Sequence, residues 1–172
     1  TLESGSFSEG LPCSFIWDYL MDCIFCQIVS GQQPSHKIWE DDKYLAFLSI
    51  FPNTEGFSVV IPKKHLSSYL FDQPEVEVAG LILASQKVAK ILDGFFSDVG
   101  RTGVIFEGYG VDHLHCKLFP MHGTGSDSKF KKISSRVNKF FERYEGYISS
   151  HDHVRADDKE LAELAHGIRN SY

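Results

Sequence analysis

The sequence predicts an α+β fold in which one long helix crosses a mostly antiparallel sheet of five strands. Short apolar runs separated by turn residues indicate the strands, and an apolar stripe with helical spacing indicates the helix. No segment repeats along the chain, and 172 residues correspond to about one domain.

The strands are recognised by their composition and by the residues that end them. The first two form a hairpin, because residues 41–43 have the composition of a turn. Pro62 ends the third strand and Pro120 ends the fifth, since proline cannot donate a hydrogen bond to a neighbouring strand. The five strands are predicted at residues 37–40, 44–49, 57–61, 102–106 and 111–119.

The longest helix is predicted at residues 74–96, where Pro74 suits the first turn and Gly94 weakens the end. Its apolar face is predicted to consist of Val78, Leu81, Ile82, Ser85, Val88, Ala89 and Leu92. Three further helical segments are predicted: a turn at 23–29, a basic amphipathic helix at 130–144, and a terminal helix at 157–170 with Asp157 as its N-cap.

We expect the chain to have three parts. Residues 1–20 are rich in Ser and Gly and are an N-terminal extension, either added before a natural start at Met21 or packed on the domain. Residues 21–127 form the domain that carries the chemistry, and residues 128–172 form a helical extension that packs on it.

Composition excludes several classes of protein. Apolar residues make up 42% and charged residues 23%, which is typical of a globular domain. No apolar run approaches the roughly 20 residues of a membrane span, so no membrane partner is expected. A net charge of −6 argues against a long nucleic-acid partner. Four cysteines without a secretory signal indicate a reduced, cytoplasmic protein.

The fifth strand carries the chemically informative residues. Because side chains alternate along a strand, His113, His115 and Lys117 share one face, while apolar residues share the other. Two imidazoles and an ammonium are costly to bury unless they are hydrogen-bonded or bound to something. The row suits a phosphoryl or nucleotidyl group, with a ring nitrogen as nucleophile and cations near the charged oxygens.

Cys23 and Cys26 form a C-x-x-C pair that suggests a metal site. A tetrahedral zinc needs two ligands more than the two thiolates, and His65 and His113 are candidates. The alternative is that the two cysteines are simply buried thiols, a common location for free cysteine.

Four segments together resemble the histidine triad (HIT) superfamily in their order and spacing. These are residues 22–28 (DCIFCQI), 44–47 (YLAF), 59–65 (VVIPKKH) and 113–117 (HLHCK), and the resemblance extends over about residues 21–125. It implies a HIT-like fold with a five-stranded antiparallel sheet and a homodimer. It also implies a catalytic domain that hydrolyses or transfers nucleotidyl groups.

The resemblance assigns roles to particular residues. The middle histidine of the triad, here His115, attacks the α-phosphate and forms a nucleotidyl-histidine intermediate. Zinc-containing members use two cysteines and two histidines as ligands, which correspond here to Cys23, Cys26, His65 and His113. Four protein ligands leave no open position, so this zinc would be structural.

Three positions depart from the family pattern. Lys117 replaces the third histidine and is expected to hold a phosphate oxygen or to protonate a leaving group. Phe57 stands where many members have a histidine. Ser49 stands where an acidic residue usually binds the ribose, and its hydroxyl is a weaker acceptor.

Further substrate contacts are expected around these positions. Ile50 is a candidate for the base pocket, and Gly108 and Gly110 let the backbone approach a phosphate. His122 follows the fifth strand and is a candidate contact.

Three hypotheses about function remain. The first is a nucleotide hydrolase or nucleotidyl transferase that uses His115 and Lys117. The second is a non-catalytic nucleotide-binding or protein-binding domain with the same fold, which the altered triad favours. The third is a redox protein using Cys23 and Cys26, but the strand-then-helix context of thioredoxin-like motifs is missing.

Overall fold

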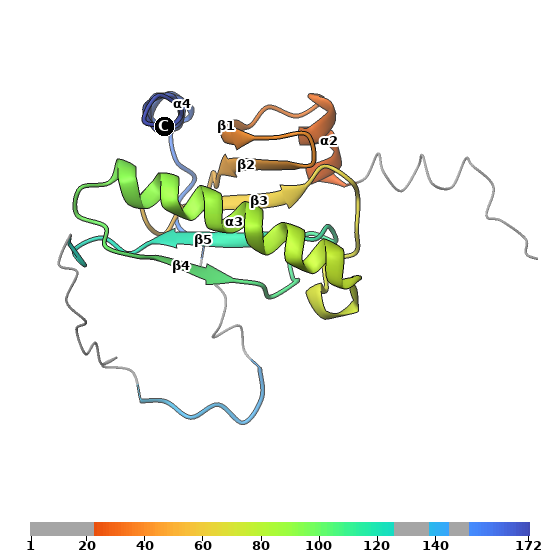
Figure 1. Ribbon diagram of the computed structural model, residues 1–172. Helices are drawn as coiled ribbons and strands as arrows, with labels where there is room; N and C mark the ends of the chain where they lie inside the picture. Colours follow the sequence, from red (N-terminus) through yellow and green to blue (C-terminus); the bar gives the residue numbers. More distant parts are fainter. Residues whose placement is uncertain (1–22, 126–137, 145–151) are drawn as a thin grey trace, which may run out of the picture.

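The computed structural model describes residues 23–125, 138–144 and 152–172 (Figure 1). Five strands form one sheet in the order β1-β2-β3-β5-β4, and every neighbouring pair is antiparallel. The strands are β1 (His36–Glu40), β2 (Tyr44–Leu48), β3 (Ser58–Pro62), β4 (Thr102–Ile105) and β5 (Cys116–Pro120). The predicted α+β fold with its five-stranded sheet and crossover helix is therefore confirmed.

Helix α3 (Glu75–Phe95) covers one face of the sheet, as Figure 1 shows. It connects β3 to β4, and its residues Leu81, Val88 and Leu92 are fully buried against the sheet. Ile82, which we predicted on the buried face, is 46% exposed because it lies at the margin of the apolar stripe. No helix in the described part of the chain combines the length and apolar character needed to cross a membrane.

The two faces of the sheet support two separate cores. Along β2, Tyr44, Ala46 and Leu48 pack toward α3, whereas Leu45 and Phe47 belong to a second cluster on the opposite face. Helix α2 (Ile24–Ser30) packs on that second face through Ile28 and Phe25. The alternation expected of strands is thus realised, and the face opposite α3 carries the polar row of β5.

Helix α4 (Asp158–Arg169) lies beside β1 at the edge of the sheet (Figure 1). The Asp157 carboxylate accepts hydrogen bonds from the backbone N–H groups of Lys159 and Glu160, which confirms the predicted N-cap. The other end is anchored where the Tyr172 hydroxyl donates to the Ile38 carbonyl over 2.9 Å. The C-terminal residues are therefore joined to the sheet at both ends of this helix.

The fifth strand is shorter than predicted, since β5 begins at Cys116 and not at residue 111. Its pairing with β3 ends at Val60–Cys116, and the next donor position on β3 is Pro62, which has no N–H. The preceding segment instead pairs with a loop: the Leu114 N–H donates to the Leu66 carbonyl over 2.8 Å. His113 and His115 consequently lie just before the strand, in an extended segment held by that loop.

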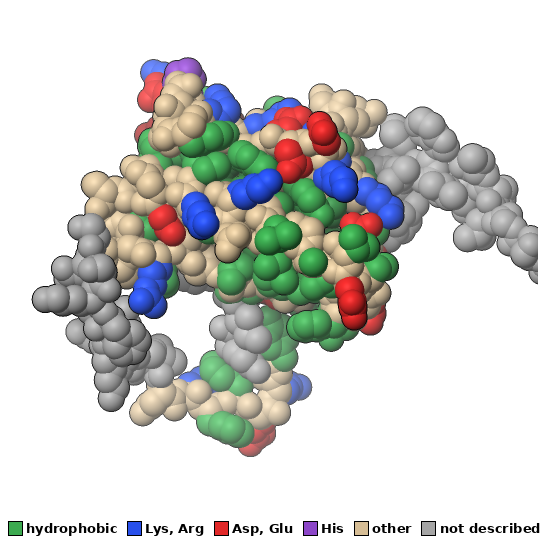
Figure 2. Space-filling view, in the orientation of Figure 1, with side chains coloured by type: hydrophobic (Ala, Val, Ile, Leu, Met, Phe, Trp, Pro, Cys, Tyr) green, Lys and Arg blue, Asp and Glu red, His purple; other side chains and the backbone are tan. Residues whose placement is uncertain are grey.

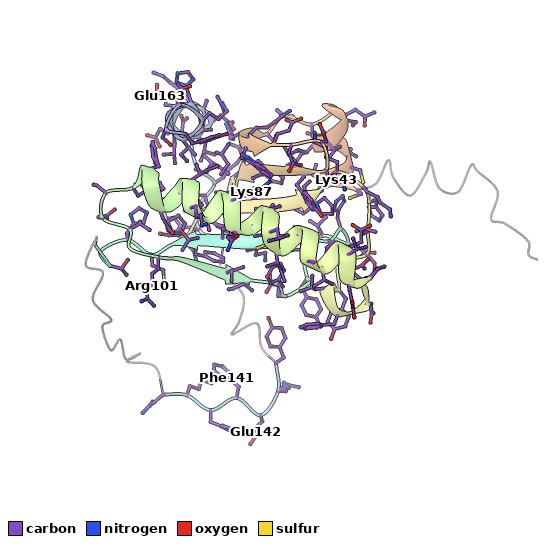
Figure 3. All side chains as sticks on the ribbon, viewed as in Figure 1. Lys43, Lys87, Arg101, Phe141, Glu142 and Glu163 are labelled. Carbon is purple, nitrogen blue, oxygen red and sulfur yellow. The ribbon has the colours of Figure 1, made fainter. Side chains whose placement is uncertain are left out.

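The basic helix predicted at residues 130–144 is not present in its described part. Residues 138–144 contain a bend at 142–143 and no helix or strand, and Figure 3 shows Phe141 and Glu142 on this segment, away from the sheet. Residues 130–137 lie outside the described residues. So do the predicted extension at 1–20 and the boundary expected at residue 127.

A tight contact between α3 and β2 provides a test of this packing. A Cβ atom on Gly80 would overlap the hydroxyl oxygen of Tyr44, whose side chain is buried, whereas a Cβ on Gly94 in the same helix would meet nothing within 4 Å. We expect Gly80→Ala to lower the free energy of unfolding by about 1–3 kcal/mol. Gly94→Ala should raise it by up to about 1 kcal/mol, the ordinary helix preference. Urea denaturation measures both changes.

The third variant in this test is the double substitution Tyr44→Phe with Gly80→Ala. Removing the hydroxyl leaves the ring carbon Cζ as the nearest atom, 3.1 Å from the new Cβ. The double variant should therefore recover most of the loss. Equal stabilisation by alanine at both glycines in the wild-type background would contradict the contact.

Candidate functional site

Two cysteines and two histidines from three parts of the chain come together in one cluster. Cys23 immediately precedes α2, Cys26 lies in its first turn, His65 follows β3, and His113 precedes β5. Their potential ligand atoms all lie within 4.8 Å of one another. The structure thus brings together all four residues that the sequence suggested, and this cluster could hold a metal ion.

The distances in the cluster fit a tetrahedral ion with two sulfur and two nitrogen ligands. Cys23 Sγ lies 3.4 Å from His113 Nδ1, and Cys26 Sγ lies 3.3 Å from His65 Nδ1 and 3.6 Å from His113 Nδ1. Metal–ligand bonds of about 2.3 Å to sulfur and about 2.0–2.1 Å to nitrogen place such atoms about 3.5 Å apart in a tetrahedron. The cluster would therefore need little adjustment to bind an ion.

The surroundings of the cluster act differently on His113 and on Cys26. His113 donates from Nε2 to the Pro62 carbonyl over 2.9 Å, which directs the Nδ1 lone pair toward the cysteines. Burial lowers the pKa of His113 to about 4, so its ring is neutral. Burial and the neighbouring Cys23 raise the pKa of the Cys26 thiol to about 12 without a cation. A bound cation would reverse this by stabilising the thiolate.

The backbone of His113 orients the ring of His115. His115 Nδ1 lies 2.7 Å from the carbonyl oxygen of His113, so Nδ1 carries the proton and donates it. Nε2 therefore keeps its lone pair. Burial lowers the pKa of His115, which keeps the ring uncharged near neutral pH. A neutral, oriented imidazole of this kind is suited to nucleophilic attack.

Lys117 lies on the same face of β5, two residues beyond His115. Its ammonium forms an ion pair with the Glu107 carboxylate, which follows the end of β4. Burial lowers the pKa of Lys117, although the negative charge of Asp152 opposes this. The ion pair engages one of the three N–H donors of the ammonium, leaving two for a ligand.

A cavity of about 950 Å³ opens beside His115 and Lys117, on the face of the sheet opposite α3. This volume lies near the upper end of the range for small-molecule sites. Most of its wall area is apolar, and Phe25 of α2, Phe47 of β2 and Val59 of β3 contribute to it. Polar and charged side chains, including His115 and Lys117, interrupt this apolar wall, a combination that is typical of ligand sites.

The C-terminal residues supply another wall of this cavity. Arg155 and Asp158 line it together with His36 from β1. Asp158 accepts from Arg155 Nη2 over 2.9 Å and lies 3.0 Å from His36 Nε2, and both contacts lower its pKa. The N–H of Ala156 donates to the Ile50 carbonyl over 2.9 Å, which fixes this segment against the end of β2.

The predicted substrate contacts are only partly brought together. Ser49, Ile50 and Gly110 line the cavity with His115 and Lys117. Gly108 does not, because its α-carbon faces the loop at Ser68: a Cβ there would lie 3.1 Å from the Ser68 carbonyl oxygen. The turn nevertheless requires glycine, since φ is 74° at Gly108 and 91° at Gly110.

His122 lies at the opposite end of β5 from His115 and does not line the cavity. Its Nδ1 is 3.0 Å from the Asp98 carboxylate and its Nε2 is 3.0 Å from the Glu55 carbonyl oxygen. The ring also packs edge-on against Phe96. His122 therefore connects loops at the far end of the sheet, and we leave it out of the candidate site.

Several cavity residues were missed from the sequence. Glu107 stood in a glycine-containing segment where no spacing marked it. The C-terminal group reaches the site only through the packing of α4 on β1, which local patterns do not reveal. The missed residues are His36, Glu107, Tyr109, Tyr144, Asp152, Arg155 and Asp158.

Solved structures have the same fold. A Hit-like protein from Bartonella henselae aligns with a TM-score of 0.65 and 25% identity, over 88% of this chain and 96% of that one. A zinc-bound histidine triad family protein from Mycobacterium smegmatis aligns with a TM-score of 0.62 and 27% identity, over 88% of this chain and 94% of that one.

Two protein relatives are similar over most of their own length. A HIT-like protein of Methanocaldococcus jannaschii is 33% identical over 118 residues, which cover 66% of this chain and 90% of the relative. Adenosine 5′-monophosphoramidase hnt1 of Schizosaccharomyces pombe is 33% identical over 100 residues, which cover 58% of this chain and 74% of the relative.

The family comparison covers the part of the chain that holds the triad segment. Residues 30–124 match the family described as HIT domain, which is more than half of the chain. These residues include the whole sheet, helix α3 and the row from His113 to Lys117. Taken with the sheet order and the site, this match shows that the chain belongs to the HIT domain family.

Proposed function

We propose that this protein is a nucleotide hydrolase or nucleotidyl transferase that acts at an α-phosphate through a covalent intermediate on His115. The observation that carries this proposal is the orientation of His115, whose Nδ1 donates to the His113 carbonyl so that Nε2 keeps its lone pair at the cavity. The relative from Schizosaccharomyces pombe that is named as an adenosine 5′-monophosphoramidase supports the same chemistry.

Some cavity residues would act on the phosphate of a nucleotide, and others would contact its sugar and base. His115 Nε2 attacks the α-phosphorus, the bond to the leaving group breaks, and Lys117 holds a phosphate oxygen with its remaining donors. Ser49 and Ile50 lie at the end of β2 and contact the sugar and base. The backbone at Gly110 approaches the phosphate where a side chain would intrude.

The first prediction concerns the nucleophile. Intact-mass analysis after brief mixing with adenosine 5′-phosphorimidazolide should show one acid-sensitive adenylyl group per chain. His115→Ala should abolish the adduct and lower turnover by more than about 1000-fold, the scale of removing a nucleophile. His122→Ala is the matched control, because it removes a histidine outside the cavity and should keep the adduct. Absence of both adduct and turnover in the wild type would favour a non-catalytic binding protein.

We further propose that the ion in the four-ligand cluster is a structural zinc. Two thiolates and two imidazoles are a preferred zinc donor set, and four protein ligands leave no open position for water. Zinc there would supply a cross-link between α2, the end of β3 and the segment that carries His115. Thiols available as ligands fit a reduced, cytoplasmic setting, which is part of this proposal.

The second prediction tests the zinc. Metal analysis of protein washed with a weak chelator should give about one zinc per chain. Cys26→Ser and His65→Asn should reduce the zinc content and lower the free energy of unfolding by about 2–5 kcal/mol, the scale of losing a cross-link. Cys116→Ala removes a buried cysteine outside the cluster and should retain zinc. Zinc content near zero, or thiols at Cys23 and Cys26 that react before metal removal, would contradict the site.

We also propose a homodimer formed through β4 and the neighbouring part of α3. Strand β4 is an edge of the sheet, and Val104 on it is 53% exposed. Figure 2 shows hydrophobic side chains gathered over the α3 face, where Val76 and Leu83 are exposed. An open strand edge beside exposed apolar side chains is a surface that proteins usually cover.

The third prediction of this section tests the dimer by light scattering. The wild type should have about twice the chain mass of 19.4 kDa. Leu83→Asp should shift it to one chain mass, because a charge would be buried in the interface. Val154→Asp, which alters an exposed apolar residue elsewhere, should leave the mass unchanged. A monomeric wild type at micromolar concentration would refute the interface.

A further inference from the structure

Glu107 lies in the cavity wall, and the proposed first step gives it no role. Its side chain is only 5% exposed, and one carboxylate oxygen, Oε1, pairs with the Lys117 ammonium. The other oxygen, Oε2, is buried and has no hydrogen-bond partner among the described residues. A buried acceptor without a partner costs about 1–3 kcal/mol, and Glu107 also lines the cavity, so a ligand that donates to Oε2 would remove this cost.

The chemistry of a carboxylate limits what this ligand can be. An ionised carboxylate only accepts hydrogen bonds, and a phosphate oxygen also accepts and is negatively charged. Glu107 therefore cannot hold the phosphate itself, which is the role of Lys117. What its free oxygen can hold is an O–H or N–H group next to the phosphorus.

The position of Glu107 relative to His115 selects water as that donor. His115, Lys117 and Glu107 all line the cavity, and Glu107 pairs with Lys117, two residues from His115, which places the carboxylate on the same side of the cavity as a phosphorus bound to His115 Nε2. Two other carboxylates line the cavity. Asp158 is engaged by His36 and Arg155, and Asp152 acts on Lys117 through its charge. Glu107 alone combines near-complete burial with an unpaired oxygen.

We propose that Glu107 is the general base of the second half-reaction, in which water releases the nucleotide from His115. This inference rests on the proposed function. The water oxygen attacks the phosphorus, and the bond between phosphorus and His115 Nε2 breaks with its electron pair returning to the ring. One water proton passes to Glu107 Oε2. The products are a nucleoside monophosphate, neutral His115 and a protonated Glu107, which then loses its proton to solvent.

Lys117 positions both the carboxylate and the phosphate in this step. Its ammonium pairs with Oε1 and holds the carboxylate in place, while its other donors hold the phosphate oxygen. The pair thus places an acceptor for the water beside a donor for the phosphate. This arrangement lets one buried ion pair orient both reactants.

The experiment separates the two half-reactions with adenosine 5′-(p-nitrophenyl phosphate). Nitrophenolate leaves without a proton, so the first step needs no acid or base. The wild type and Glu107→Gln should both release a burst of about one nitrophenolate per chain. The steady-state rate of Glu107→Gln should fall by about 10²- to 10⁴-fold, the usual contribution of a general base. Intact-mass analysis should then show the adenylyl-enzyme accumulating in the variant.

Two further variants distinguish a chemical role from a structural one. Glu40→Gln is the matched control, because Glu40 also pairs with lysines, Lys37 and Lys63, but lies outside the cavity. It should behave as the wild type. Glu107→Ala should be rescued by azide, which attacks phosphorus without losing a proton and yields the nucleoside phosphorazidate. A merely structural role predicts no such rescue.

The outcomes can be told apart. A normal steady-state rate in Glu107→Gln overturns the inference while the nucleotidyl-histidine stands. Equal loss of the burst and of the steady-state rate also overturns it, because Glu107 would then act in the first step or in folding. A wild type that gives neither burst nor adduct refutes the proposed function, and the inference with it.

Discussion

His113 joins the two halves of the site, and the rest of the arrangement depends on how it is held. Its Nδ1 faces Cys23 and Cys26, its Nε2 donates to the Pro62 carbonyl, and its own carbonyl accepts from His115 Nδ1. The same residue thus contributes a ring nitrogen to the four-residue cluster and orients the ring of His115. Movement of the segment before β5 would therefore disturb the cluster and the His115 ring at once.

The site also depends on paired charges. Lys117 pairs with Glu107 in the cavity wall, and Asp158 pairs there with Arg155 and hydrogen-bonds to His36. The pair of Lys117 and Glu107 is largely buried, so it is costly to form but holds both side chains in defined positions. Arg155 and Asp158 lie beyond the matched HIT domain, and their segment is fixed by the hydrogen bond from Ala156 to Ile50. C-terminal residues outside the matched range therefore form part of the cavity wall.

Much of the fold could be predicted because local patterns encode it. Alternating apolar residues marked the strands, and the cap at Asp157 marked the last helix. The predictions failed where a tertiary contact competes with a local pattern. β5 starts late because Pro62 cannot continue the pairing, and residues 138–144 do not form the expected helix despite its apolar spacing.

The sequence alone established the family resemblance, the four possible metal ligands and the row of His113, His115 and Lys117, because these depend on residue identity and short spacing. It could not identify the carbonyl that orients His115, or the carboxylate that pairs with Lys117. Both depend on backbone and side-chain placement between segments that only folding brings together. Nor could it exclude His122, since closeness along a strand does not reveal which end of the sheet faces the cavity.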